Sequence, residues 1–355
     1  MQINFFNLID NLRALDGSDL HLVADHVPWH RVHGVLRPVD GHPPVGSDDI
    51  LRVVRDLVSE RQFEEFKQRQ ELDAAVTVGD GYRLRINAYI QQDTVAAAVR
   101  LLPNTFFSLD ELGLNRHLLT RIIRMHAGLV LVTGATGSGK STTIASLVNE
   151  INRSRACHIH TIEDPVEYRH ASQKALVTQR EVGRDTASFA EALRRSMRED
   201  PDVVVVGEMR DLETMSAALT LAETGHLTFA TLHTSDAVQT VSRIVSQFPA
   251  AQQAQITAQL AAALRVVVCQ QLVPWDNGRG QSLAAEILTV TSAVRSLIRD
   301  GKVHQIKNAI QTGQAEGMQT MDQSLHELVR TQRISLPTAV EYSANHQAFM
   351  GEVTG

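Results

Sequence analysis

One short segment of this chain has the residue types and the spacing that bind the phosphates of a nucleotide. Gly134-Ala-Thr-Gly-Ser-Gly-Lys-Ser141 fits the pattern Gly-x-x-x-x-Gly-Lys-Ser, in which glycines let backbone N–H groups point at phosphate oxygens. The segment follows the apolar run Gly128–Thr133 and opens a helical pattern, so a helix N-terminus adds favourable potential for an anion. The pattern predicts a Walker A phosphate loop. A glycine-rich turn that binds no ligand is the alternative.

The side chains of this loop have separate expected roles with ATP and Mg²⁺. Lys140 is expected to reach the β- and γ-phosphates, Ser141 to bind Mg²⁺, and Thr142 to lie near the α-phosphate. The residues before the lysine are expected to surround the phosphates with backbone N–H groups: Thr136, Gly137, Ser138 and Gly139. The sequence therefore predicts ATP and Mg²⁺ as ligands.

Acidic side chains follow two other apolar runs. Glu163 and Asp164 come directly after Cys157–Ile162, and Glu208 follows Asp202–Val206 across one glycine. ATP hydrolysis needs one group that orients or deprotonates water and another that holds Mg²⁺. Ligands of parallel sheets bind at the carboxyl ends of the strands. A carboxylate at a strand end is usually a solvated loop charge, but beside a phosphate loop both become candidates for these two tasks.

His233 ends a fourth apolar run, Leu227–Leu232. It is a candidate to sense the γ-phosphate or to relay its presence to a neighbouring group. It is equally a candidate for a hydrogen-bonded histidine of the core, and the spacing alone leaves both interpretations open.

The residues before the loop predict a small α/β domain over residues 1–100. Apolar residues recur at helical spacing over Ile50–Phe66, and Gly79-Asp80-Gly81 predicts a turn between two strands. Strands are predicted at Leu72–Val78, Tyr82–Tyr89 and Val95–Leu102. Pro103-Asn104 interrupts the pattern, and residues 101–115 are the predicted linker.

Residues 116–355 alternate strand and helix, which predicts a parallel sheet covered by helices. The four apolar runs named above are the predicted strands, and helices are predicted between them at Ser141–Asn152, Phe189–Arg198 and Leu212–Glu223. From about Val290 the pattern is purely helical, with helices predicted at Ser292–Asp300, Val303–Thr312, Met321–Gln332 and Leu336–Asn345.

Composition argues against several other classes of protein. The net charge of −6 disfavours sequence-independent binding of nucleic acid, and the two cysteines form no CxxC pair, so no structural zinc site is predicted. Arg265 and Gln270 interrupt the longest apolar run, which is too short to span a membrane. The segment Met1–Leu12 lacks the features of a signal peptide. We therefore expect a cytoplasmic protein whose membrane contacts are peripheral.

Four segments, in this order, resemble the motifs of the secretion-superfamily ATPases, which power type II secretion and the assembly and retraction of type IV pili. Gly134–Thr142, Thr161–Tyr168, Val206–Asp211 and Thr224–Thr234 are similar to the Walker A, Asp, Walker B and His boxes. Earlier in the chain, Gly17–Leu22 and Arg83–Asn87 resemble the N-terminal domain of the family. The resemblance covers nearly the whole chain. It implies a PAS-like α/β domain followed by a RecA-like P-loop ATPase domain with a helical C-terminal tail.

Within this superfamily the chain most resembles the retraction ATPases of twitching motility (PilT type). We expect it to lack the extra N-terminal domain of assembly ATPases, and it has no pair of CxxC motifs for their four-cysteine zinc insertion. Ala293–Arg299 resembles the Ala-Ile-Arg-x-Leu-Ile-Arg helix of the retraction family, with Val294 in place of isoleucine. The resemblance implies a homohexameric motor at the inner face of the cytoplasmic membrane. Its implied partners are the inner-membrane pilus platform protein and an accessory retraction ATPase.

The resemblance also implies roles for particular residues. Glu163 matches the catalytic glutamate, Glu208 the Walker B carboxylate near Mg²⁺, and His233 the His-box residue. In this family, arginines of the N-terminal domain reach the nucleotide, and Arg83 and Arg85 are the matching positions. Their spacing puts both on one face of a strand, where plain surface charge is the alternative. Further candidates are Arg194, Arg198 and Arg243.

Functions of other classes remain open at this point. A RecA-like nucleic-acid translocase would share the loop, although the acidic net charge and the lack of an aromatic-basic stripe disfavour it. A regulatory scaffold would bind ATP without hydrolysis, although both acidic boxes are present. Within the superfamily, the alternatives are a pilus assembly ATPase, a type II secretion ATPase and an accessory retraction paralogue.

Overall fold

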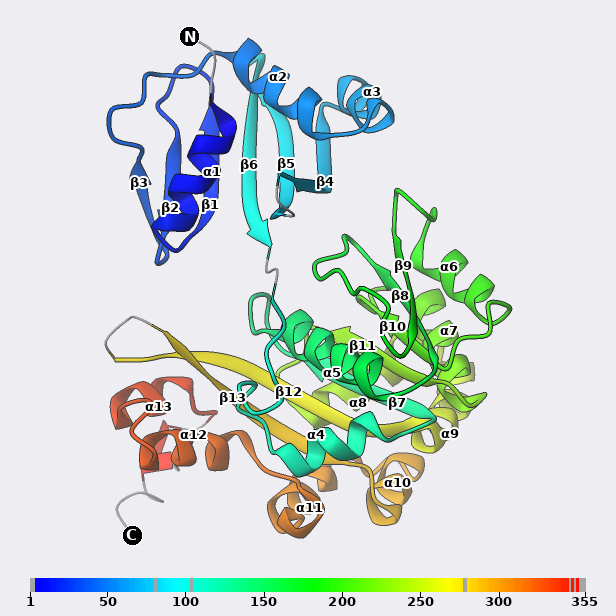
Figure 1. Ribbon diagram of the computed structural model, residues 1–355. Coiled ribbons are helices and arrows are strands. Elements are labelled where there is room, and N and C mark those ends of the chain that lie inside the picture. Colours follow the sequence, from blue (N-terminus) through cyan, green and yellow to red (C-terminus); the bar gives the residue numbers. More distant parts are fainter. Residues whose placement is uncertain are drawn as a thin grey trace. The chain divides into compact units, whose positions relative to one another are not determined.

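The computed structural model describes residues 4–79, 82–102, 105–276, 280–344, 346–347 and 349–350. The chain divides into two compact units, Met1–Thr105 and Phe106–Gly355 (Figure 1). The boundary between the units falls within the segment expected to be a linker. The expected break at Pro103-Asn104, the turn residues Asp80 and Gly81, and the expected helix end at Asn345 lie outside the described residues.

The N-terminal unit is built on an antiparallel sheet with the strand order β3-β2-β1-β6-β5-β4. Its elements are α1 (Phe5–Ala14), β1 (Gly17–Val23), β2 (Trp29–Val32), β3 (Val35–Pro38), α2 (Ser47–Leu57), α3 (Glu60–Arg69), β4 (Glu71–Val78), β5 (Tyr82–Gln91) and β6 (Thr94–Leu102). Alternate strand residues such as Leu84 and Ile86 enter one core with Leu8, Val54 and Phe66 of the helices. The three strands predicted here are confirmed.

The helical spacing noted over Ile50–Phe66 belongs to two helices, α2 and α3. α2 ends at Leu57, and α3 begins at Glu60 with Ser59 as its N-cap. Ser59 accepts from the N–H of Gln62, whose side chain accepts from the N–H of Ser59. This capping box starts a new helix. The apolar periodicity continues across the break because both helices cover the same core.

The C-terminal unit is built on a second sheet with the order β13-β12-β7-β11-β10-β8-β9. Its strands are β7 (Gly128–Thr133), β8 (His158–Glu163), β9 (Leu176–Glu181), β10 (Val203–Val206), β11 (Leu227–Leu232), β12 (Leu264–Pro274) and β13 (Gln281–Thr289). Neighbouring strands run parallel except β12 and β13, which are antiparallel. The sheet is therefore mixed rather than parallel throughout. β9, β12 and β13 were not predicted.

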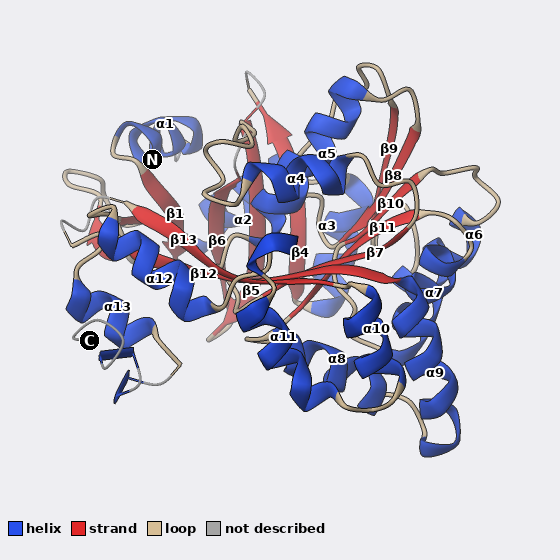
Figure 2. Ribbon diagram, turned by 90° about the horizontal axis from the view of Figure 1, so that it is seen from below, coloured by secondary structure: helices blue, strands red, loops and turns tan. Residues whose placement is uncertain are grey.

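Helices cover both faces of this sheet (Figure 2). α4 (Arg116–Ile123) and α5 (Lys140–Ser154) lie on one face, and the other carries α6 (Phe189–Ser196), α7 (Leu212–Glu223), α8 (Ala237–Ser246), α9 (Ala250–Ala263) and α10 (Ser292–Arg299). Successive strand residues point to opposite faces. Val130 and Val132 of β7 therefore enter one core, and Leu129 and Leu131 enter the other. Burial on both faces explains why these strands are apolar throughout.

Beyond Val290 the helical pattern is confirmed in the described residues. After α10 come η1 (Val303–Gln305), α11 (Ile306–Thr312), η2 (Gln314–Glu316), α12 (Met321–Arg330) and α13 (Leu336–Tyr342). The last two helices pack on β12 and β13 around Val273, Ala284 and Leu325. In the described ranges, no helix has both the length and the apolar character needed to cross a bilayer.

A buried amide ties α5 to the chain that follows β8. Asn152 is fully buried. Its Nδ2 donates to the carbonyl of Ala171 at 2.8 Å, and its Oδ1 accepts from the N–H of Gln173 at 3.0 Å. Its own carbonyl accepts from the N–H groups of Lys174 and Ala175. These bonds hold the segment after β8 against the helix that begins in the phosphate loop.

Replacing Asn152 by alanine should lower the free energy of unfolding of the full chain by about 1–3 kcal/mol, because two backbone groups lose their partner. Urea unfolding measures the change. Asn308→Ala, at an exposed position of α11, is the matched control and should change stability by less than about 0.5 kcal/mol. Equal effects of the two substitutions would show that Asn152 does not have this role.

Candidate nucleotide-binding and catalytic site

Parallel pairing brings the carboxyl ends of four strands to one edge of the sheet. Thr133 at the end of β7 is paired with Leu232 of β11. Val206 of β10 is paired with Ile162 of β8 and with Ala230 of β11. The segments that follow these strands therefore begin at the same edge: the phosphate loop, Glu163, Glu208 and His233.

Three glycines of the loop, Gly134, Gly137 and Gly139, have backbone conformations that other residues rarely adopt. Gly134 has a φ of 141° and Gly139 a φ of 84°. A Cβ on Gly134 would lie 2.2 Å from the carbonyl oxygen of Gln270 and 2.6 Å from Ser138 Oγ. Gly139 is the N-cap of α5, so the tight turn leads directly into a helix N-terminus. Glycine is therefore required at the positions of Gly134 and Gly139 for this loop conformation.

Lys140 is folded over its own loop. Its Nζ donates to the carbonyl oxygens of Gly134 at 2.8 Å and Ala135 at 2.9 Å. Burial lowers the pKa of Lys140, and the carboxylates of Glu208 and Glu167 oppose that shift. The ammonium group is thus fixed at the loop, within electrostatic reach of the carboxylate predicted to lie near Mg²⁺.

A buried amide on the neighbouring strand supports the loop. Gln270 of β12 donates from Nε2 to the carbonyl of Ser138 at 2.8 Å, across 132 positions of sequence. Gln270 is only 2% exposed. In the sequence it was noted only as an interruption of an apolar run. That polar residue in an apolar strand was nevertheless a usable signal, because buried amides are almost always hydrogen-bonded.

The tyrosine of the Asp box is bonded to the first turn of α5. Tyr168 Oη lies 2.9 Å from Thr142 Oγ1, and Tyr168 is 4% exposed. Burial raises the pKa of Tyr168, so its hydroxyl stays protonated at neutral pH. The cleft beside this contact is lined by Ser141, Glu163 and Tyr168, among others. The residue predicted to bind Mg²⁺ and the predicted catalytic glutamate therefore line the same cleft.

Glu163 is enclosed at the end of β8. Its Oε1 accepts from Thr161 Oγ1 at 2.7 Å and from Gln179 Nε2 at 3.3 Å. Burial raises the pKa of Glu163 to about 7, although these hydrogen bonds act to lower it, and the charge of Glu167 adds to the rise. A carboxyl group with a pKa near 7 is suited to accept a proton from water at neutral pH.

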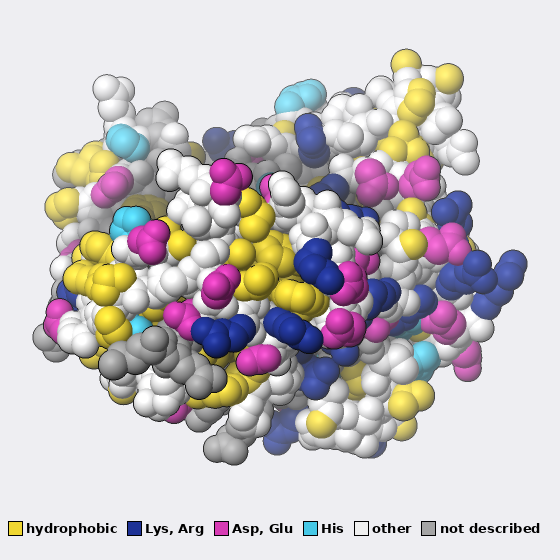
Figure 3. Space-filling model, turned by 90° about the horizontal axis from the view of Figure 1, so that it is seen from above, with side chains coloured by type: hydrophobic (Ala, Val, Ile, Leu, Met, Phe, Trp, Pro, Cys, Tyr) yellow, Lys and Arg dark blue, Asp and Glu magenta, His cyan; other side chains and the backbone are white. Residues whose placement is uncertain are grey.

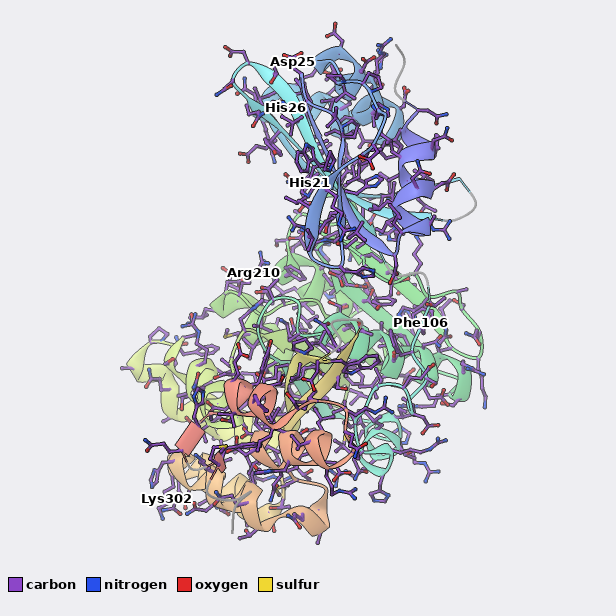
Figure 4. All side chains as sticks on the ribbon, turned by 90° about the vertical axis from the view of Figure 1, so that its left-hand side faces the viewer. His21, Asp25, His26, Phe106, Arg210 and Lys302 are labelled. Atoms are coloured by element: carbon purple, nitrogen blue, oxygen red, sulfur yellow. The ribbon has the colours of Figure 1, made fainter. Side chains whose placement is uncertain are left out.

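Glu208, unlike Glu163, lies beside basic side chains. Arg210 Nη2 is 2.8 Å from its Oε2, and His233 Nε2 is 3.1 Å from its Oε1. Burial acts to raise the pKa of Glu208, but Arg210 and His233 outweigh it and lower the pKa below its usual value. Glu208 is therefore ionised at neutral pH. Arg210, labelled in Figure 4, was given no role from the sequence.

His233 is not a core histidine, because its side chain is 43% exposed. It lines an open hollow together with Glu208 and Arg243 of α8. Of the other arginine candidates, Arg194 pairs with Glu191 on its own helix at 3.4 Å, and Arg198 is exposed just beyond α6.

Arg83 and Arg85 belong to the N-terminal unit. They alternate with core residues of β5 and therefore share one face of the strand, as their spacing predicts. Arg83 is buried, with its Nη1 3.5 Å from Thr77 Oγ1. Arg85 forms a two-pronged ion pair with Asp73, at 3.0 and 2.6 Å. Their contact with a nucleotide stays a prediction.

A second cleft adjoins the start of α5. Gly139 and Thr142 line it together with Leu272, Trp275 and Leu283. Apolar walls with an aromatic ring suit the flat face of a nucleobase, and this cleft lies next to the predicted phosphate site. It was not predicted, because its walls come from β12, β13 and the helical tail rather than from any local motif.

Replacing Gln270 by alanine should weaken nucleotide binding, because the carbonyl of Ser138 loses its buried partner. We expect the affinity for a non-hydrolysable ATP analogue to fall about fivefold or more and the stability to fall by about 1–3 kcal/mol. Calorimetric titration and urea unfolding measure the two effects. Gln271→Ala removes a comparable bond, to the carbonyl of Tyr342 at 3.0 Å, and should lower stability alone. Wild-type affinity in Gln270→Ala would contradict the supporting role.

Known proteins are similar to this chain over nearly its whole length. The family model described as type II/IV secretion system protein matches residues 29–348. The type IV pilus retraction ATPase PilT of Pseudomonas aeruginosa is 45% identical over 324 residues, which are 91% of this chain and 93% of that protein. A twitching motility protein of Neisseria gonorrhoeae is 44% identical over 328 residues, covering 92% of this chain and 87% of that protein.

A solved structure agrees with these relatives. The crystal structure of the pilus retraction motor PilT with bound ADP is similar with a TM-score of 0.90 at 41% identity, and the match covers 98% of this chain and 99% of the other. The resemblance inferred from the four sequence motifs is thereby confirmed. The chain belongs to the type II/IV secretion system protein family.

Proposed function

We propose that this chain is an ATP-hydrolysing motor that powers the retraction of type IV pili. One observation carries the hydrolysis: the cleft beside Ser141 is also lined by Glu163, whose pKa is raised by burial to about 7. The names of the relatives that match over nearly their full length support retraction rather than assembly: a pilus retraction ATPase, a twitching motility protein and a pilus retraction motor.

The phosphate loop would hold ATP together with Mg²⁺. Backbone N–H groups of Thr136–Gly139 and the Lys140 ammonium would bind phosphate oxygens, with Thr142 near the α-phosphate. Mg²⁺ prefers hard oxygen ligands, and the hydroxyl of Ser141 and the ionised carboxylate of Glu208 are of that kind. Among the described residues, no group of three or more His, Cys, Asp or Glu side chains could hold a metal ion.

Glu163 is the proposed base for the attacking water. Its carboxylate would orient a water molecule against the γ-phosphate and accept a proton from it. Glu208, with its lowered pKa, would stay charged throughout. His233, 3.1 Å from Glu208, would respond to changes at the γ-phosphate through that carboxylate.

We propose a homohexamer in which Arg83 and Arg85 of one copy reach the nucleotide of a neighbouring copy. Two guanidinium groups on one face of β5 suit a shared phosphate target. Arg85 would exchange its partner Asp73 for phosphate. Breaking the ion pair between Arg85 and Asp73 loses little free energy, because a solvent-exposed ion pair contributes only about 0–1 kcal/mol.

In this proposal residues 1–100 are the moving domain, residues 101–115 the linker and residues 116–355 the ATPase domain. The motor would work at the cytoplasmic face of the inner membrane, on the pilus platform protein and beside an accessory retraction ATPase. No nucleic-acid partner is proposed. Basic and acidic side chains are interspersed on the face drawn in Figure 3, whereas nucleic-acid binding calls for a basic surface.

Hydrolysis should depend on the protonation of Glu163, whose pKa is raised to about 7. Because only the ionised carboxylate accepts a proton, kcat/KM should fall about tenfold per pH unit below that pKa and level off above it. Steady-state ATPase assays from about pH 5.5 to about pH 8.5 measure the profile. Nucleotide binding recorded at each pH separates occupancy from chemistry.

Glu167→Gln is the matched control for this profile. It removes a charge that raises the pKa of Glu163, so the midpoint should move to lower pH while turnover persists. A profile that is flat across neutral pH in the wild type would rule out Glu163 as the base.

Deleting the gene from its source organism should produce hyperpiliated cells that do not twitch, because pili would assemble without being retracted. Electron microscopy of pili and the spreading of colony edges measure the two traits, and expression of the wild-type chain should restore both. Cells without pili would instead indicate an assembly motor. An ATPase rate strongly stimulated by single-stranded DNA would favour the translocase.

A further inference from the structure

Phe106, the first residue of the C-terminal unit, is held by two other rings. Its ring stacks on Tyr168, with centroids 5.6 Å apart and planes at 29°, and on His170, at 4.7 Å and 27°. The next residue, Phe107, is 49% exposed. Figure 4 labels Phe106. Of two consecutive phenylalanines, the first is therefore fixed by stacking where the C-terminal unit begins.

One of the stacked rings, that of Tyr168, is hydrogen-bonded to the helix that begins in the phosphate loop. Tyr168 Oη and Thr142 Oγ1 are 2.9 Å apart. Tyr168 and His170 also line the cleft that contains Ser141 and Glu163. The surface on which Phe106 stacks is thus part of the wall of the proposed catalytic cleft.

The backbone that carries these rings is tied to the proposed base. Gln179 Nε2 donates to the carbonyl of Tyr168 at 2.9 Å and to Glu163 Oε1 at 3.3 Å, and its Oε1 accepts from the N–H of His170 at 2.8 Å. One amide therefore connects both ring-bearing residues to the carboxylate.

The stack does not depend on an ionised histidine. Burial lowers the pKa of His170 to about 4, so its ring is neutral at physiological pH. The contact with Phe106 is therefore one between two uncharged aromatic rings. A change in the cleft alters this stacking by shifting the position of the His170 ring rather than its charge.

We propose that Phe106 is a positioning residue that couples the nucleotide state of the cleft to the chain entering the C-terminal unit. The inference rests on the proposed ATPase function. A phosphate near Thr142 changes the hydrogen bond open to Tyr168, and a water bound to Glu163 changes the bond from Gln179. Both changes shift the rings of Tyr168 and His170, on which Phe106 stacks. Phe106 therefore holds the backbone around it more firmly in one nucleotide state than in another.

Hydrogen exchange of the backbone amides of Thr105 to Ser108, measured on the full chain, tests this coupling. In the wild type, exchange with a non-hydrolysable ATP analogue should differ about fivefold from exchange with ADP, the factor that one intramolecular hydrogen bond provides. Phe106→Ala, which removes the stacked ring, should reduce the difference to less than about twofold. Tyr168→Phe keeps the ring and removes only the hydroxyl, so it should reduce the difference while the route through Gln179 remains.

Two further variants separate coupling from general damage. Phe106→Tyr keeps an aromatic ring and should retain the wild-type difference. Leu176→Ala truncates an exposed apolar side chain of β9 and should also retain it. Binding of the ATP analogue to Phe106→Ala should stay within about threefold of the wild type, since the ring stacks on Tyr168 and His170 rather than on residues of the phosphate loop.

The outcomes distinguish this inference from the proposed function. Wild-type protein that does not hydrolyse ATP would contradict the proposed function. Wild-type hydrolysis, together with an unchanged exchange difference in Phe106→Ala and Tyr168→Phe, would overturn the coupling alone. A Phe106→Ala protein that loses nucleotide binding altogether would also overturn it, because Phe106 would then be a support of the site.

Discussion

The parallel register of β7, β11, β10 and β8 is the constraint on which the candidate site depends. The loop follows Thr133, Glu163 ends β8, and Glu208 lies just beyond Val206, so the register alone brings them to one edge. A slip of one residue would turn every side chain of a strand to the opposite face. Because each face of the sheet has its own apolar core, such a slip would expose or displace both cores. The packing of the sheet thus maintains the geometry of the site.

At this edge, two carboxylates are given different properties by their surroundings. Burial keeps the pKa of Glu163 near 7, whereas Arg210 and His233 overcome burial and lower the pKa of Glu208. Pairs of this kind let one group exchange a proton while the other keeps its charge. Each of the two carboxylates is also connected by hydrogen bonds or ion pairs to neighbouring residues. Glu208 is joined to His233 in an open hollow. Glu163 is joined through Gln179 to the backbone of Tyr168 and His170, on whose rings Phe106 stacks.

The sequence alone could predict the parts whose signals are local. The four central strands lie within one residue of their expected bounds, because burial on both faces produces plain apolar runs. β9, β12 and β13 of the same sheet were not predicted. β9 is a half-exposed edge strand, and β12 begins directly after α9 without a turn, so its apolar run merges with the helix. The supports of the site, such as Gln270 beneath Ser138 and Tyr168 beside Thr142, are contacts that only the folded chain creates.

ATP turnover by the purified Glu163→Gln protein tests most directly whether the cleft beside the phosphate loop is a site of hydrolysis. The amide keeps the shape of the side chain but cannot accept a proton from water. At ATP concentrations that saturate both proteins, we expect Glu163→Gln to bind ATP as the wild type does and to lose turnover by about 10²-fold to 10⁴-fold, the usual contribution of a general base. Turnover at the wild-type rate in Glu163→Gln would contradict the proposed chemistry.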